Sequence, residues 1–265
     1  MRTVILIPAR YASSRYPGKP LAMLRQPDGR AKSLIRMSWE AARAVKGIDA
    51  VYVATDDTRI AEATEAFGGE VIMTDPACEN GTVRCADALA RLPGPAPDLV
   101  VNFQGDAPLT PPWFVEELVA AMAAEPGLAM ATPILRCDRT AYSAFIEDRR
   151  NGRVGGTTVV ADAAGRALYF SKEVIPFIDP GKLPDPVPVF HHVGVYAYRP
   201  EALRAYVAAG PCQLEELEGL EQLRFLHAGI PVRCVEVSAR GRVFWELNNP
   251  HDVGRIEAAL RAQQT

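Results

Sequence analysis

Short apolar runs alternate with amphipathic segments through the first half of the chain. The first run, residues 3–7, is uninterrupted, as expected of a strand that is buried on both faces. Similar runs follow at residues 51–54, 70–73 and 99–103, and the segments between them show helical spacing of apolar residues. This alternation predicts an α/β protein with a doubly wound, mostly parallel central sheet and right-handed crossovers.

The second half of the chain has a different pattern. Residues 157–161 and 167–170 resemble the two strands of a hairpin, and residues 176–188 hold five prolines, which predicts a loop. We expect further elements in this half: a strand over 193–198, a helix over 200–208, an acidic helix over 214–228, a strand over 231–237 and a last helix from Pro250, capped by Asn249. Residues 1–265 therefore predict a single domain with a smaller antiparallel lobe at about 135–200.

Composition excludes several classes of protein. A chain of 265 residues with 48% hydrophobic residues can bury one large core, which excludes disorder. A net charge of -3 leaves no basic footprint for nucleic acid. No apolar run approaches the roughly 18–20 residues of a membrane span, and the start of the chain does not resemble a signal peptide. Five scattered cysteines without a CxxC pair fit reduced thiols, so we expect a cytoplasmic protein with no nucleic-acid or membrane partner.

The loop after the first strand is the most informative segment. Residues 7–20 carry Arg10, Arg15 and Lys19 together with two serines and a glycine. In doubly wound sheets ligands bind beyond the carboxyl ends of the strands, and cations with small residues there suit a polyphosphate. Neither a Walker loop nor a dinucleotide-binding fingerprint occurs. A solvated basic loop is the alternative on these residues alone.

Eight motifs match, in order, those of one known family. They lie at residues 8–21, 53–57, 67–69, 81–84, 102–106, 167–171, 192–199 and 220–224. The chain resembles the 3-deoxy-manno-octulosonate cytidylyltransferases (CMP-Kdo synthetases) and, more broadly, the sugar nucleotidyltransferases. The resemblance implies a Rossmann-like nucleotidyltransferase fold, transfer of CMP from CTP to an acidic sugar with release of pyrophosphate, and a homodimer built through the smaller lobe, which would also bind the sugar.

The resemblance also implies a nucleotide site and a magnesium ion. Arg15 and Lys19 would act in catalysis by stabilising the leaving pyrophosphate, and Asp106 would bind Mg²⁺, which prefers one or two carboxylates with water and phosphate oxygens. Without the resemblance, Asp106 reads as a turn or cap residue. The implied nucleotide-binding residues are Ala9, Arg10, Ser14, Arg15, Lys19, Ala54, Thr55, Asp56, Asn80, Gly81, Thr82 and Gln104.

A second group of residues is implied for the acceptor. The sugar-binding residues would be Lys172, His192, Tyr196, Glu215 and Gln222. Two of them have plainer alternatives. His192 could be an ordinary strand residue, and Glu215 could belong to a solvated acidic helix face.

Several departures from the family pattern concern the metal and the sugar. Asn248 stands where the family has a second metal-binding Asp, and an amide oxygen can ligate a hard cation but brings no charge. Glu246 could supply that charge instead. Lys172 replaces an Arg of the family, which keeps the charge but loses the bidentate fork. Two alternatives therefore stay open: transfer to another acceptor, such as a phosphonate or a different acidic sugar, and a non-catalytic nucleotide-binding protein.

Overall fold

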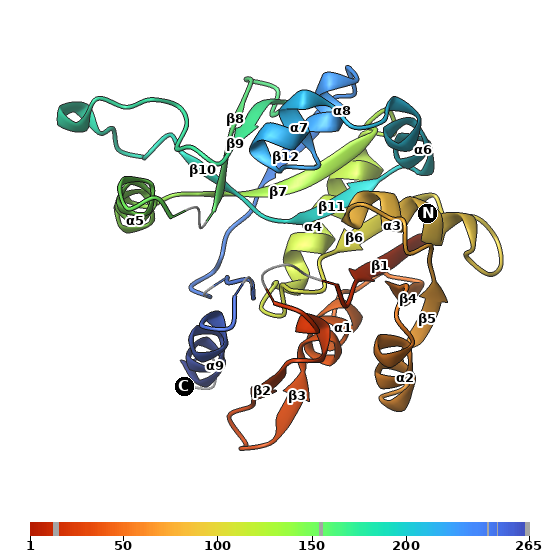
Figure 1. Ribbon diagram of the computed structural model, residues 1–265. Coiled ribbons are helices and arrows are strands. Elements are labelled where there is room, and N and C mark those ends of the chain that lie inside the picture. Colours follow the sequence, from red (N-terminus) through yellow and green to blue (C-terminus); the bar gives the residue numbers. More distant parts are fainter. Residues whose placement is uncertain (13–15, 154–155, 243, 248, 263–265) are drawn as a thin grey trace.

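The computed structural model describes residues 1–12, 16–153, 156–242, 244–247 and 249–262. Within them, ten strands form one sheet in the order β5-β4-β1-β6-β11-β7-β10-β8-β9, with β12 paired to β7 (Figure 1). Its strands are β1 (Thr3–Ala9), β4 (Ala50–Thr55), β5 (Glu70–Met73), β6 (Leu99–Phe103), β7 (Met130–Arg136), β8 (Thr157–Ala161), β9 (Ala167–Ser171), β10 (Phe190–His192), β11 (Val195–Tyr198) and β12 (Val232–Glu236). Strands β2 (Met23–Arg25) and β3 (Ala31–Ser33) form a separate antiparallel pair.

Helices cover both faces of the sheet. They are α1 (Leu34–Arg43), α2 (Thr58–Ala66), α3 (Gly81–Ala90), α4 (Pro112–Ala124), α5 (Arg139–Arg150), α6 (Pro200–Ala209), α7 (Gln213–Glu218), α8 (Leu223–His227) and α9 (Asp252–Ala262), with 3₁₀ turns η1 (Lys19–Leu21) and η2 (Pro180–Lys182). One core joins α1, α2 and α4 to the sheet, and another joins α3, α6 and α8 to the opposite face. The predicted α/β class with a doubly wound sheet is confirmed.

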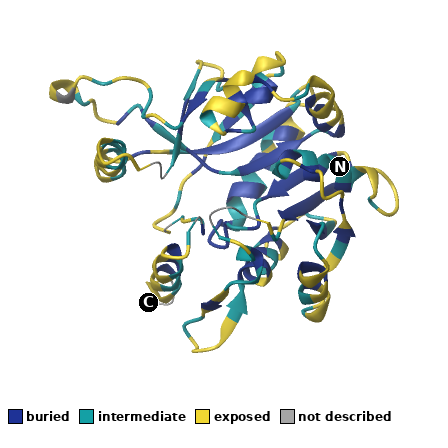
Figure 2. Cartoon of the chain, viewed as in Figure 1, coloured by how far each residue is buried: buried dark blue, intermediate teal, exposed yellow. Residues whose placement is uncertain are grey.

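Strand β1 is the central element of the parallel half of the sheet. It lies between β4 and β6, parallel to both, and all seven of its residues are buried. Val4 and Leu6 belong to one core and Ile5 and Ile7 to the other, so the uninterrupted apolar run serves two faces. Full burial of each such side chain stabilises the fold by about 1.5–3 kcal/mol. Figure 2 shows the central strands as the most buried part of the chain.

The sheet changes character between β10 and β11. These strands follow one another along β7, with His192 opposite Ile134 and Ala197 opposite Ala131. β11 pairs antiparallel with β6 of the parallel half, whereas β10 pairs with β8 of the antiparallel hairpin. The strand predicted over 193–198 is therefore the second of two short strands. The antiparallel lobe predicted at about 135–200 corresponds to α5, β8, β9 and β10, and its part in sugar binding and dimerisation stays a prediction.

Two predicted helices differ in their bounds. The acidic segment 214–228 forms α7 and α8 rather than one helix, because Gly219, with φ 59°, ends α7 in the left-handed conformation. The last helix begins at Asp252, whose carboxylate accepts a hydrogen bond from the backbone N–H of Asn249 at 2.7 Å. Asn249 thus precedes the helix, two residues earlier than a cap would stand.

The sequence prediction lacked strands β2, β3, β7 and β10 and helix α5. β7 and β10 pair antiparallel with one another, and no residue of α5 is buried. In the part of the chain that the structure describes, no helix has the length and apolar character needed to cross a membrane. All five cysteines are free and buried, as the scattered pattern predicts.

Candidate functional site

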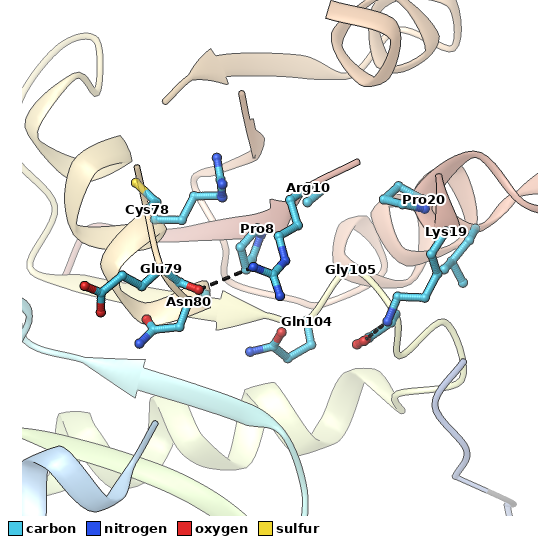
Figure 3. Close-up of a pocket in the computed structure, with 14 residues that line it drawn as sticks. Pro8, Arg10, Lys19, Pro20, Cys78, Glu79, Asn80, Gln104 and Gly105 are labelled. Carbon is cyan, nitrogen blue, oxygen red and sulfur yellow. Dashed lines mark hydrogen bonds and ion pairs between the residues drawn. The ribbon is translucent and has the colours of Figure 1, made fainter. Parts of the chain in front are cut away.

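A cleft of about 250 Å³ opens where β1 and β6 end (Figure 3). Its wall is built by the loop after β1, the first turn of α3 and the loop after β6, which is where ligands of such sheets bind. The lining residues are Pro8, Ala9, Arg10, Lys19, Pro20, Leu34, Cys78, Glu79, Asn80, Gly81, Arg84, Gln104, Gly105 and Asp106. The cleft therefore gathers half of the twelve residues that the sequence assigned to the nucleotide, namely Ala9, Arg10, Lys19, Asn80, Gly81 and Gln104.

Lys19 and Asp106 meet inside this cleft. Lys19 Nζ lies 2.5 Å from Asp106 Oδ2, and the two side chains are 14% and 24% exposed. Gly18, with φ 70°, turns the chain into η1, and its N–H donates to the Tyr11 carbonyl at 2.9 Å. That turn directs Lys19 toward the carboxylate of Asp106, and the dashed line from Lys19 in Figure 3 marks this ion pair.

Further cations line the described part of the cleft. Arg10 is exposed, and its Nη1 donates to the Glu79 carbonyl oxygen at 3.4 Å. Together with Lys19 and Arg84 it makes the cleft suitable for a polyanion. Two other predicted residues of this loop, Ser14 and Arg15, lie outside the described residues.

The loop after β4 is connected to the cleft by an ion pair between Asp56 of this loop and Arg84, which lines the cleft. Arg84 is 3% exposed; its Nη1 lies 3.2 Å from Asp56 Oδ1 and donates to Thr74 Oγ1 at 2.5 Å. Because Arg84 lines the cleft, Asp56 contributes by holding it. Ala54 and Thr55 are fully buried and do not line the cleft, so their part in nucleotide binding stays a prediction.

Asn80 caps α3 at the cleft. Its Oδ1 accepts the backbone N–H of Val83 at 2.8 Å, which satisfies one of the free donors of the first turn. Asn80 and Gly81 both line the cleft, and a Cβ on Gly81 would lie 3.2 Å from Gln104 Nε2. The helix start therefore lies close against the loop after β6.

Glu221 joins that helix start to Gln104. Its Oε2 accepts the N–H of the buried Thr82 at 3.0 Å, and its Oε1 accepts Gln104 Nε2 at 3.3 Å. Burial raises the pKa of Glu221, against the opposing effect of the Thr82 N–H. These bonds fix two predicted nucleotide-binding residues relative to one another.

A second pocket, of about 560 Å³, adjoins the cleft and shares Glu79 and Asn80 with it. It is lined by Glu79, Asn80, Tyr196, Pro211, Glu215, Glu216, Gly219, Leu220, Glu221, Gln222 and Arg224. Among these are Tyr196, Glu215 and Gln222, three of the residues implied for the acceptor. Tyr196 donates its hydroxyl to Gln222 Oε1 at 3.3 Å.

The other two predicted acceptor residues lie beside this pocket. His192 is 6% exposed, contacts Thr132 Oγ1 at 3.0 Å through Nε2, and packs against the ring of Tyr196. Burial lowers the pKa of His192 to about 3, so its imidazole is neutral. Lys172 extends its amino group over Gly219, where a Cβ would lie 2.7 Å from Nζ.

The segment expected to complete a metal site runs alongside Asp106. The backbone N–H of Leu247 donates to the Asp106 carbonyl at 2.8 Å. Glu246 and Gln104 both lie against Gly194. A Cβ added to Gly194 would lie 3.2 Å from Glu246 Oε1 and 3.6 Å from Gln104 Cγ. Asn248 lies outside the described residues.

The donors at this place are oxygens. Within the described ranges, no group of three or more His, Cys, Asp or Glu could hold a metal by itself. An ion here would take Asp106 together with ligand oxygens and water, a donor set that fits Mg²⁺ better than a softer metal.

Three residues were not assigned a role from the sequence, although they stand within motifs that it singled out. Arg84 closes the motif at residues 81–84, and Glu221 and Arg224 belong to the motif at 220–224. The signal that could have found them is charge: each is an ionisable side chain that the fold buries wholly or in part.

Comparisons with known proteins agree with this geometry. A family model described as cytidylyltransferase matches residues 4–233. A 3-deoxy-manno-octulosonate cytidylyltransferase of Maricaulis maris is 46% identical over 264 residues, which are 99% of this chain and 98% of that protein. An 8-amino-3,8-dideoxy-manno-octulosonate cytidylyltransferase of Shewanella loihica is 42% identical over 98% of this chain and 99% of its own.

Solved structures share the fold over the full chain. A CMP:2-keto-3-deoxy-manno-octonic acid synthetase complexed with CTP superposes with a TM-score of 0.84 at 34% identity, covering 100% of both chains. A 4-diphosphocytidyl-2C-methyl-D-erythritol synthase from Anaerococcus prevotii has a TM-score of 0.59 at 14% identity, covering 98% of this chain and 96% of that one. At that identity the second likeness concerns the fold alone.

Proposed function

The chain belongs to the cytidylyltransferase family, and from this premise we propose that it transfers CMP from CTP to 3-deoxy-manno-octulosonate or a related ulosonic acid. A hydroxyl of the acceptor attacks the α-phosphate, the bond between the α- and β-phosphates breaks, and pyrophosphate leaves. The observation that carries this proposal is the cleft in which Lys19 meets Asp106, joined at Asn80 to a second pocket. Such an arrangement suits two substrates that react at a shared wall.

The triphosphate occupies the cationic cleft in this proposal. Arg10, Arg15 and Lys19 neutralise its oxygens, and Arg15 and Lys19 stabilise the charge that develops on the departing pyrophosphate. Phosphoryl transfer depends on positioning and charge neutralisation more than on covalent chemistry. The remaining proposed nucleotide contacts are Ala9, Ser14, Asn80, Gly81 and Gln104. Ala54, Thr55, Asp56 and Thr82 do not line the cleft, and in this proposal they support its wall.

We further propose that Asp106 holds Mg²⁺, with Asn248 or Glu246 as a second ligand. Support comes from the position of Asp106 in the cleft wall and from the backbone bond that brings residue 247 against it. When bound, the ion would supply positive charge to the phosphate oxygens and lower the pKa of the attacking hydroxyl. Lys19 holds the Asp106 carboxylate at the cleft, where an ion and the phosphates can share it.

The acceptor takes the second pocket. Lys172 offers the positive charge for its carboxylate, and Tyr196, Glu215 and Gln222 line the space that its hydroxyl groups enter. The ring of the neutral His192 packs against the ring of Tyr196 and holds it in place. The relatives are named for two different acceptors. We favour 3-deoxy-manno-octulosonate because a relative named for it is 46% identical to this chain, against 42% for the relative named for the 8-amino sugar.

We also propose a homodimer in the cytoplasm. The smaller lobe offers exposed apolar side chains that a second copy could cover: Leu168 on β9 is 62% exposed and Phe177 is 88% exposed. Sedimentation of the purified protein at micromolar concentration distinguishes the dimer from a monomer.

Pyrophosphate release tests the proposed reaction. The protein is incubated with Mg²⁺, one nucleoside triphosphate and one acceptor, with CTP compared against UTP and 3-deoxy-manno-octulosonate against its 8-amino analogue and a phosphonate. We expect release with CTP and 3-deoxy-manno-octulosonate. Release with another acceptor alone would correct the acceptor, and CTP binding without release in any mixture would show a nucleotide-binding protein instead.

A further inference from the structure

Glu215 lies at the centre of a buried network in the wall of the second pocket. Arg224 donates to it twice, from Nε to Oε2 at 2.6 Å and from Nη2 to Oε1 at 2.8 Å. The side chain of Glu215 is 11% exposed and that of Arg224 is 3% exposed. The Arg224 guanidinium also lies 4.1 Å from the ring centroid of Tyr206. Tyr206 donates its hydroxyl to Glu215 Oε1 at 3.0 Å. Both carboxylate oxygens are therefore already engaged.

This network reaches the nucleotide cleft through Asn80. Asn80 Nδ2 donates to the Tyr206 hydroxyl at 2.9 Å and to Glu215 Oε1 at 3.3 Å. Since a carboxylate only accepts hydrogen bonds, it fixes the amide of Asn80 with its NH₂ group toward Glu215. The amide oxygen is then free to cap α3 at Val83. A reversed amide would place oxygen against oxygen and leave the helix uncapped.

Arg224 also connects the Glu215 carboxylate to Glu79. Arg224 Nη2 lies 3.5 Å from Glu79 Oε2, and the Glu79 carbonyl oxygen accepts a hydrogen bond from Arg10 Nη1 at 3.4 Å. Glu79 and Asn80 are the residues that the cleft and the second pocket share. The charge of Glu215 therefore supports the shared wall at both of its residues.

We propose that Glu215 is a positioning residue for the nucleotide: it orients Asn80 and the first turn of α3 so that the cleft keeps the shape that binds CTP. This inference rests on the proposed function, and it gives Glu215 a task other than contact with the acceptor. It makes CTP binding depend on a side chain that lies outside the nucleotide cleft.

Calorimetric titration with CTP tests the inference on the full chain. Glu215→Gln keeps the shape of the side chain but turns an amide NH₂ or a weaker acceptor toward Arg224 and Asn80. We expect about a tenfold increase in the Kd for CTP, the effect of losing one charged hydrogen bond. The KM for CTP should rise by a similar factor while kcat changes less than about twofold. If Glu215→Gln only reduces the amount of folded protein, kcat and the binding stoichiometry fall while Kd and KM stay at their wild-type values. Unchanged values of Kd and KM would overturn the inference.

A double-mutant cycle separates positioning from independent effects. If Glu215 acts mainly through Asn80, Glu215→Gln weakens CTP binding less in the Asn80→Ala background than in the wild type. Additive losses would contradict the inference. The matched control is Glu201→Gln on α6, whose 73% exposed side chain pairs with Arg204 at the surface, and it should bind CTP as the wild type does.

Tyr206→Phe keeps the inference testable if Glu215→Gln does not fold. It removes the hydroxyl that bridges Glu215 and Asn80 and retains the ion pair with Arg224. We expect about a threefold weaker affinity for CTP, and unchanged affinity would overturn the inference. Wild-type protein that fails to bind CTP would overturn the proposed function as well, whereas equal binding by wild type and Glu215→Gln overturns the inference alone.

Discussion

Lys19 Nζ and Asp106 Oδ2 lie 2.5 Å apart, although 87 positions separate the two residues in the chain. The parallel sheet causes this proximity, because β1 and β6 are neighbours and their carboxyl ends open on the same side. A cation for the leaving phosphates and a carboxylate for Mg²⁺ thus face one cleft.

Replacement of Asp106 by asparagine should abolish most of the turnover. The variant keeps the size of the side chain and removes the charge that would hold Mg²⁺, so we expect kcat to fall by about 10²–10³. Pyrophosphate release at saturating CTP measures the effect, and circular dichroism checks the fold. Wild-type rates in Asp106→Asn would contradict the role given to this carboxylate.

Replacement of Lys19 by alanine should slow the reaction by about 10²-fold, because the departing pyrophosphate loses a positive charge. The same assay measures it. Lys32→Ala is the matched control: Lys32 Nζ pairs with Glu40 Oε2 at 2.6 Å, and neither residue lines the cleft. Equal losses in both lysine variants would show a general effect of charge rather than a task at the site.

Replacement of Arg84 by alanine should destabilise the fold. It leaves the Asp56 carboxylate without its cation and removes a hydrogen bond to Thr74, so we expect the free energy of unfolding to fall by about 3 kcal/mol. Urea denaturation followed by fluorescence measures this quantity. Arg204→Ala, which breaks a surface pair with a 67% exposed arginine, should cost less than about 1 kcal/mol, and a similar loss in both would refute the prediction.

Acidification should weaken the fold through His192. Burial holds its pKa at about 3 in the folded chain, against 6.5 in the unfolded one. Below pH 6.5 the unfolded chain binds a proton that the folded chain does not, so stability is full above this pH and falls as the pH drops toward 3. Between pH 7 and pH 5 this group contributes a loss of about 2 kcal/mol.

Urea denaturation of the wild type and of His192→Gln at both pH values tests this dependence. The variant should lose about 2 kcal/mol less than the wild type on acidification. The control is His227→Gln, at an exposed histidine at the end of α8, which should follow the wild type. An identical pH dependence in wild type and His192→Gln would show that His192 does not titrate in this way.

The parallel half of the fold could be predicted from the sequence because its strands are continuous apolar runs. Strand β7 could not, since Pro133 interrupts its apolar run, and a proline argues against an interior strand. In the structure the Pro133 carbonyl still accepts a hydrogen bond from Val193, so the strand is kept. Helix α5 was missed because none of its residues is fully buried; only Ala141, Tyr142 and Phe145 pack in part against the cluster of Cys137, Val187 and Val189.

Without the resemblance, the site could be predicted only where neighbouring strands end. The loops after β1 and β6 meet at the cleft, as the order of strands requires. The position of Glu215 against Asn80 depends on how α6, α7 and α8 pack on α3, and 135 residues separate the two. No local sequence pattern encodes such packing. The sequence therefore predicted that Glu215 either contacts the acceptor or belongs to a solvated helix face.

Transfer of label from the α-phosphate of CTP tests the central claim most directly. The protein is incubated with Mg²⁺, 3-deoxy-manno-octulosonate and CTP that carries ³²P at either the α- or the γ-position, and the products are separated. The account predicts that the α-label appears in a sugar nucleotide and the γ-label in pyrophosphate, in equal amounts. An α-label that stays in CTP, or that appears only in free CMP, would contradict it.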